Sequence, residues 1–142
     1  MQPFHVTIHA RSPDVASGGP VITIAGRAYP TLVVPHQSLA ATFSSSFEEA
    51  VAALSRLPRM FVEPDGSFVW VSSTGESPWQ VDGVLYDRDG KLLLVDLKGM
   101  CTSLALDQVM AAFGWPDMPV MFQLTREAVY ADEATFRLMA GS

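Results

Sequence analysis

The chain has 142 residues, of which 49% are hydrophobic and 17% are charged, so its composition is that of one packed domain, 1–142, and excludes long disordered stretches. Its net charge is −6 and its nine Lys and Arg residues are scattered singly, which argues against non-specific nucleic-acid binding because such binding depends on many phosphate contacts. The single cysteine, Cys101, excludes an internal disulfide and a thiolate zinc site and favours a reducing compartment.

The first residues of the chain lack the basic region and the unbroken apolar stretch of a secretory signal. No apolar run approaches the length of a membrane span. We therefore expect a soluble, cytoplasmic protein that makes no membrane contact.

The N-terminal part of the chain predicts three strands. Residues 4–9 alternate between apolar and polar side chains, which is the pattern of a half-buried strand. Residues 21–24 and 31–34 are predicted to pair with each other around a Gly26-Arg27 turn. Because the flanking prolines Pro30 and Pro35 cannot donate hydrogen bonds to a ladder, this pair is expected at a sheet edge.

A first helix is predicted after the serine run that follows. Ser45 with Glu48, or Ser46 with Glu49, has the spacing of a capping box. Apolar residues then recur on one helical face, and Pro58 ends the helix.

Residues 59–98 contain two similar units, 61–71 and 85–95, that lie 24 residues apart. Each reads as a strand, a three-residue turn and a strand, with Gly66 or Gly90 where a left-handed residue is needed. The stretch therefore predicts a four-strand antiparallel meander.

The C-terminal part predicts two more helices and a strand. Thr102 or Ser103 can cap a helix that Gly114 and Pro116 end. The strand 119–124 follows, and a strand, a helix and a strand in succession predict that it runs parallel to 91–98 in the same sheet. A closing helix is expected from Asp132 onward. The whole pattern predicts a single α+β domain with a mixed, mainly antiparallel sheet and two to three helices.

The second hairpin of the meander carries the residues with the clearest chemical interest. A three-residue turn pairs Asp87 with Lys91, and counting back along the strands sets Asp82 across from Asp96, with Gln80 across from Lys98. One face of this hairpin is apolar and is expected to be buried, and its large residues are Trp79, Val81, Leu85, Leu93, Val95 and Leu97.

Two facing carboxylates destabilise an antiparallel pair, so something should offset the charge of Asp82 and Asp96. A divalent ion such as Mg²⁺ would do so, because hard cations prefer carboxylate and water ligands. Lys98, diagonal to Asp82, would do so too.

Asp82 followed by Asp96-Leu97-Lys98 resembles the motif of the PD-(D/E)XK nuclease superfamily, with Val81 where the family has proline. The family core of helix, three strands, helix and strand is similar to residues 45–124 with one additional strand. The resemblance implies that Asp82 and Asp96 bind Mg²⁺ and that Lys98 orients or activates the attacking water. It also implies an acidic residue on the first helix, which would be Glu48 or Glu49.

Two interpretations of these residues remain open. In the first, Asp82 and Lys98 form a salt bridge, Asp96 is solvated, and the chain is a non-enzymatic binding or assembly domain that joins a protein partner or a second copy. In the second, the chain is a Mg²⁺-dependent nucleic-acid hydrolase or an inactive descendant of one. His5 and His9 share a strand face and are expected to be solvated, and Cys101 is expected to be a partly buried residue without a catalytic role.

Overall fold

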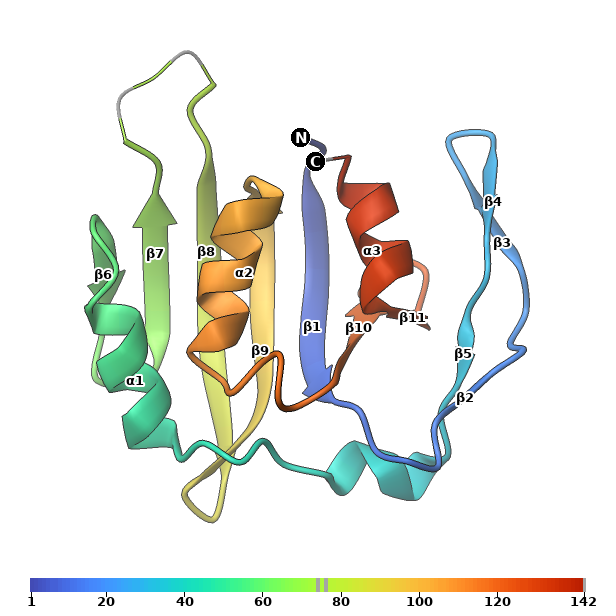
Figure 1. Ribbon diagram of the computed structural model, residues 1–142, viewed down its shortest axis with the longest axis horizontal. Coiled ribbons are helices and arrows are strands. Elements are labelled where there is room, and N and C mark those ends of the chain that lie inside the picture. Colours follow the sequence, from blue (N-terminus) through green and yellow to red (C-terminus); the bar gives the residue numbers. More distant parts are fainter. Residues whose placement is uncertain (74, 76, 142) are drawn as a thin grey trace.

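The structure is built on one seven-stranded sheet, which the computed structural model describes over residues 1–73, 75 and 77–141. The strand order is β11-β10-β1-β9-β8-β7-β6, and every neighbouring pair is antiparallel (Figure 1). The strands are β1 (Phe4–Ala10), β6 (Met60–Val62), β7 (Ser67–Val71), β8 (Gln80–Arg88), β9 (Lys91–Met100), β10 (Val120–Leu124) and β11 (Val129–Asp132). The α+β class, the mainly antiparallel sheet and the four-strand meander are therefore confirmed.

β1 lies in the middle of the sheet, between β9 and β10. Val6 pairs with Leu97 on one side and with Leu124 on the other. Because β9 and β10 are both antiparallel to β1, they run in the same direction, as predicted, but they are not neighbours. The alternation of β1 sends Val6 and Ile8, both fully buried, to one face and His5 and Thr7 to the other.

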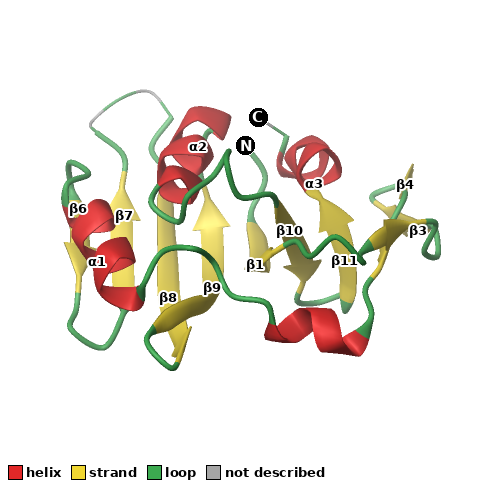
Figure 2. Cartoon of the chain, turned by 60° about the horizontal axis from the view of Figure 1, so that its bottom comes forward, coloured by secondary structure: helices red, strands yellow, loops and turns green. Residues whose placement is uncertain are grey.

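Three α-helices cover one face of this sheet (Figures 1 and 2). α1 (Phe47–Ser55) begins at the predicted capping box, in which the Ser46 hydroxyl accepts from Glu49 N–H at 3.0 Å and Ser46 N–H donates to the Glu49 carboxylate at 2.9 Å. Thr102 caps α2 (Ser103–Ala111), and Asp132 caps α3 (Glu133–Ala140). None of the described helices has the length and apolar character needed to span a bilayer.

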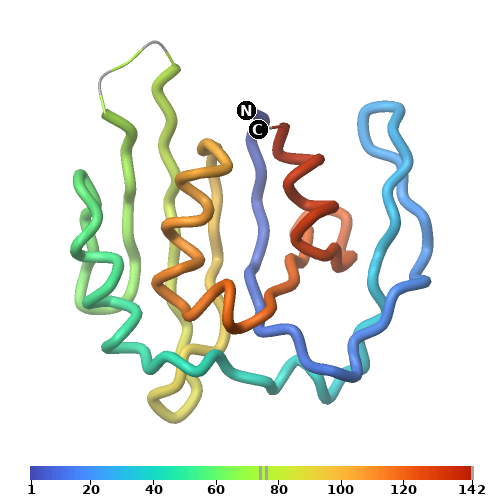
Figure 3. The backbone as a smooth tube through the Cα atoms, viewed as in Figure 1, coloured from blue at the N-terminus to red at the C-terminus, as the bar shows by residue number. Residues whose placement is uncertain are grey.

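The main core lies between the helices and the sheet. The Phe136 ring of α3 stacks on Phe122 of β10 with centroids 4.3 Å apart and meets Phe4 of β1 edge-on at 5.2 Å. The first residues of the chain and the end of α3 lie side by side beyond this cluster (Figure 3), where Gln2 N–H donates to Ala140 C=O at 2.9 Å. Residues far apart in the sequence therefore close the same end of the core.

A small N-terminal lobe lies beside β11 and consists of β2 (Ala16–Ser17), β3 (Ile22–Ile24), β4 (Arg27–Tyr29), β5 (Leu32–Val33) and the 3₁₀ helix η1 (His36–Ala40) (Figure 1). The predicted pairing of 21–24 with 31–34 is wrong, because β3 pairs with β4 and β5 pairs with β2. Ala25 and Gly26 both have positive φ and form a two-residue turn. This turn pairs β3 with β4, the strand that follows it directly in the sequence.

The β2–β5 part of the lobe packs on the face of the sheet that the helices leave free, whereas Ile22 and Ile24 of β3 pack against the main core. Val15 and Leu32 contact Met121 of β10 in a second small core. His9 lies on this face and is only 6% exposed, so the expectation that it is solvated is wrong. Nothing in β1 itself revealed this cover, because it comes from a separate part of the chain.

The register predicted for β8 and β9 is wrong by two residues. Asp89 and Gly90, both with positive φ, form a two-residue turn in which Arg88 pairs with Lys91, and this shifts the register by one residue. An irregularity next to Asp87 shifts it by one more. Asp82 consequently pairs with Lys98, and Asp96 pairs with Val84 instead of Asp82.

A shift of two residues leaves most side chains on the predicted face. Val81, Leu85, Val95 and Leu97 are buried as predicted. Leu93 is half-buried, because the irregularity turns Leu92 into the core in its place. The prediction is also wrong for Trp79, which is half-buried just before β8 and meets the Trp70 ring edge-on at 4.9 Å.

Candidate functional site: the open face of the sheet

The open face is the side of β6, β7, β8, β9 and β1 that the helices do not cover. Cross-strand pairing assigns alternate residues of these strands to it. They are Phe61, Ser67, Val69, Val71, Gln80, Asp82, Val84, Tyr86, Leu94, Asp96, Lys98, Met100, His5 and Thr7. The N-terminal lobe covers the neighbouring part of the same side, over β10 and β11.

An apolar band crosses the open face from β6 to β9. Phe61 is 63% exposed, Tyr86 is 49% exposed and Val69 is 36% exposed. Val84 and Leu94 are half-buried between them. Phe61 pairs with Val69, and Tyr86 pairs with Leu94, so members of the band touch across strand boundaries. The band runs diagonally across the strands, because Val69 is opposite Asp82 and Val84 is opposite Asp96. It gathers five apolar residues, whereas single exposed apolar residues are ordinary on a protein surface.

A polar corner, formed by His5, Asp82, Asp96, Lys98 and Gln80, lies alongside the band, with Asp82 opposite Val69 and Asp96 opposite Val84. His5 Nε2 is 3.1 and 3.2 Å from the two carboxylate oxygens of Asp96. The Gln80 side-chain amide donates to the Asp82 carboxylate at 2.9 Å. Lys98 pairs with Asp82 on β8 and with His5 on β1 but makes no ion pair with any residue that the structure describes.

The structure thus brings Asp82, Asp96 and Lys98 onto one face, but not in the predicted geometry. Asp82 and Asp96 are diagonal neighbours, whose Cβ atoms are typically about 7–8 Å apart, rather than opposed neighbours at about 5 Å. The predicted salt bridge between Asp82 and Lys98 is not among the ion pairs of the described residues. Each carboxylate instead has a hydrogen-bond donor of its own.

The acidic residue that the resemblance implies on the first helix does not reach this corner. Glu48 and Glu49 are on α1, which covers the other face of the sheet. Glu49 is also engaged in the capping box, where hydrogen bonds from Ser46 hold the pKa of its carboxyl below the ordinary value. Over the described residues, no group of three or more His, Cys, Asp or Glu side chains is arranged to hold a metal ion.

His5 is the residue of the polar corner that the sequence interpretation missed. The alternation of β1 does predict that His5 and Thr7 share a face. What no local pattern predicts is that β9 lies beside β1 and brings Asp96 to the imidazole.

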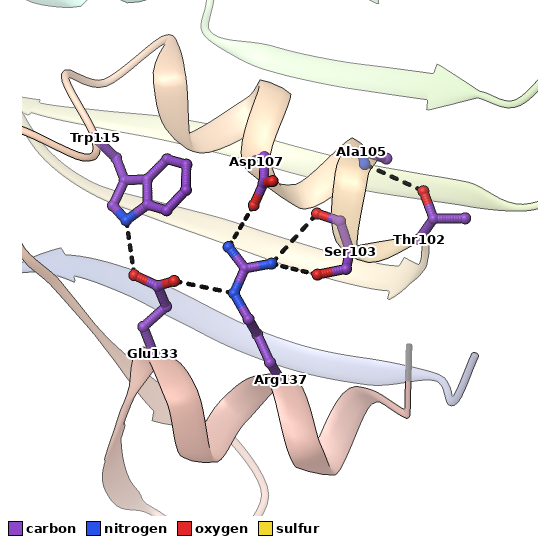
Figure 4. A network of polar contacts seen from close by, with 7 residues as sticks. All are labelled: Thr102, Ser103, Ala105, Asp107, Trp115, Glu133 and Arg137. Carbon is purple, nitrogen blue, oxygen red and sulfur yellow. Dashed lines mark hydrogen bonds and ion pairs between the residues drawn. The ribbon is translucent and has the colours of Figure 1, made fainter.

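A second polar cluster ties α2 to α3 and is structural (Figure 4). The Arg137 guanidinium donates to Asp107, to Ser103 and, at 3.0 Å, to the other carboxylate of the cluster, Glu133. The indole N–H of Trp115 donates to Glu133 at 2.7 Å. Every charged group of the cluster thus has a partner within it, so the cluster fixes the two helices and leaves no group free for a ligand.

Cys101 is more deeply buried than the predicted partly buried cysteine, with only 4% exposed. Burial raises the pKa of its thiol to about 11. The group is therefore a thiol at neutral pH and lacks the thiolate that a nucleophile requires.

Comparison of the chain with protein-family models, with curated protein sequences and with solved structures finds no significant match.

Proposed function

We propose that this chain is a non-enzymatic assembly domain that binds a second copy of itself through the open face. The observation that carries the proposal is the diagonal apolar band of Phe61, Val69, Val84, Tyr86 and Leu94, which is exposed or half-buried. Water leaves this surface when two sheets pack face to face, and such burial is the main favourable term in association. The cytoplasmic location expected from the single cysteine belongs to the same proposal.

The charges of the open face favour a second copy as the partner. A twofold contact uses the same patch on both chains, so the patch must be complementary to itself. The polar corner meets this requirement, because the carboxylate of Asp82 and the ammonium of Lys98 lie side by side and neither has an ion-pair partner among the described residues. Each is available to the opposite charge of the other copy.

The size of the open face also suits a dimer. The five strands are spaced by about 4.8 Å and are three, five, nine, ten and seven residues long, which gives a flat area of about 20 by 23 Å. Side-chain relief adds to this area, which suits a small interface of up to about 600 Å² for each partner.

The experiment is sedimentation equilibrium of the wild type and of Val69→Lys. Val69 pairs with Asp82, so a lysine there gains an opposite charge in the monomer while it breaks the apolar band. Val33→Lys is the matched control, because Val33 is a similarly exposed strand valine of the N-terminal lobe, at 48%. We expect a dimer for the wild type and the control and a monomer for Val69→Lys. A wild type that stays monomeric at submillimolar concentration would contradict the proposal.

The alternative function, Mg²⁺-dependent hydrolysis of nucleic acid or descent from such an enzyme, stays a prediction of the resemblance. What favours it is that Asp82, Asp96 and Lys98 share the polar corner. In that role the two carboxylates would hold the ion and Lys98 would act on the attacking water. It is the less favoured function, because the opposed carboxylates that called for a metal are in fact diagonal.

A further inference from the structure

A cleft opens at the end of the core where β1 begins, and it shares only His5 and Lys98 with the open face. It has a volume of about 420 Å³ and lies between the start of β1, the β10–β11 turn and the last turn of α3. Ile24, at the tip of the β3–β4 hairpin, also lines it. The volume is at the small end of the range of about 300–1,000 Å³ that is usual for ligand sites.

The walls of this cleft are apolar and held in place by the core. Phe136 and Leu124, which line it, are almost completely buried, at 1% and 6% exposure. Phe136 is fixed between Phe122 and Phe4 by ring contacts. Met139 adds a flexible apolar side chain from α3. Such a surface is preformed for a hydrocarbon group and offers little to a purely polar ligand.

Two cations line the same cleft, although the chain as a whole has a net charge of −6. They are Lys98 and Arg126, and both are exposed. In the described part of the chain neither forms an ion pair, whereas Arg137 binds two carboxylates. Glu127, the carboxylate in the lining, is within ion-pair distance of neither cation, and His5 is held by Asp96.

We propose that this cleft binds a small amphiphilic carboxylate. Its hydrocarbon chain lies against Phe4, Ile24 and Met139, which are half-buried and rest on the buried wall. Its head group is bound by Lys98 and Arg126. The apolar walls argue against a bare inorganic anion, and the two unpaired cations argue against a neutral or cationic amphiphile.

The test is isothermal titration calorimetry of the whole protein with decanoate, acetate and decyltrimethylammonium. Acetate has the carboxylate head group without the hydrocarbon chain. Decyltrimethylammonium has a hydrocarbon chain of the same length but a cationic head group. We expect saturable binding of decanoate below its micelle concentration and no binding of the other two. Equal binding of decanoate and decyltrimethylammonium, or no binding of decanoate, would overturn the proposal.

Variants locate the site. The double variant Lys98→Gln/Arg126→Gln should weaken decanoate binding about tenfold or more, because the carboxylate loses its hydrogen bonds to two cationic side chains. Ile24→Ser should weaken it by removing an apolar wall from a hairpin outside the sheet. The control Arg88→Gln removes an exposed cation at the far end of β8 and should leave the affinity unchanged. An unchanged affinity in both cleft variants would contradict the site.

The titration is repeated with Val69→Lys, which separates this proposal from the assembly function. Decanoate binding should persist or tighten in that variant, because Val69 does not line the cleft and Lys98 is no longer engaged by Asp82 of a second copy. Loss of binding together with loss of the dimer would show that the ligand site belongs to the interface and would overturn the cleft as an independent site.

Discussion

His9 couples the stability of the fold to pH. Its Nε2 lies 2.7 Å from the Thr7 hydroxyl, which in turn donates to Gln123 at 3.2 Å. Since the Thr7 proton is committed to Gln123, the imidazole donates to Thr7 from its neutral form. Burial lowers the pKa of His9 from 6.5 to about 4. The native state therefore excludes a proton that the unfolded chain binds below about pH 6.5.

We expect the contribution of neutral His9 to the free energy of unfolding to be complete above pH 6.5. It should decrease as the pH drops toward 4, so that the free energy of unfolding falls by about 2 kcal/mol between pH 7 and pH 5 because of His9. Urea denaturation at the two pH values measures the loss. His9→Gln keeps a donor to Thr7 and should reduce the loss, whereas His36→Gln, at an exposed position of η1, should not. An equal loss in wild type and His9→Gln would show that other groups cause it.

The carboxylates of the polar corner give a second prediction at the scale of residues. Asp96 is paired with His5, and Asp82 accepts from Gln80. Because they are diagonal rather than opposed, we expect that millimolar Mg²⁺ leaves the melting temperature of the wild type unchanged. A rise that depends on Mg²⁺ concentration and disappears in Asp96→Asn would instead support the hydrolase alternative, by linkage of binding to stability.

At the scale of elements, the β8–β9 register is directly testable with paired cysteines. Opposed residues have Cα atoms about 4.5–5.5 Å apart, which a disulfide can span, whereas diagonal residues are too far apart for an unstrained bond. We expect Asp82→Cys/Lys98→Cys to oxidise to an intramolecular disulfide under mild conditions. Asp82→Cys/Asp96→Cys should stay reduced. Mass spectrometry of the intact chain distinguishes the two, and the reverse outcome would restore the register predicted from sequence.

The same hairpins show how far local sequence predicts an element. The Pro64-Asp65-Gly66 turn has three residues, as predicted, with Gly66 at φ 93° and its N–H donating to Glu63 C=O at 3.0 Å. In the second hairpin Asp89 itself adopts a positive φ of 52° and shortens the turn to two residues. Aspartate is among the few residues that accept this conformation easily, so the two turn types compete and the sequence does not decide between them. The helix caps at Ser46 and Thr102 were predictable, because a cap depends on three or four adjacent residues.

At the scale of the whole molecule, the arrangement of the sheet was not predictable from the chain order of its strands. β1 comes first in the sequence but lies between β9 and β10, so its neighbours are about ninety or more residues away. The alternation of residues 4–9 predicts a strand but contains no information on these neighbours. Consequently Asp82, Asp96 and Lys98 could be predicted to share a face, whereas the contribution of His5 to their corner could not.

The helices explain why one face of the sheet remains open. Over the described residues, the three α-helices lie on the other side, and the N-terminal lobe packs on the open side over Met121 of β10 and Tyr130 of β11. Within the same part of the chain, the apolar band on β6 to β9 stays exposed or half-buried. Contact with a partner would bury this band, and burial of the band by a second copy is the central claim of the assembly proposal.

Methyl and aromatic NMR spectra of the wild type, recorded over a dilution series, test this claim most directly. We predict that dilution shifts the resonances of Val69, Val84, Leu94 and the Phe61 and Tyr86 rings, because they leave a buried interface. Leu104 and Leu138 are internal controls, since they are exposed at 70% and 55% on α2 and α3, on the other side of the sheet, and should not shift. Spectra that do not change with concentration, or changes confined to Leu104 and Leu138, would contradict assembly through the open face.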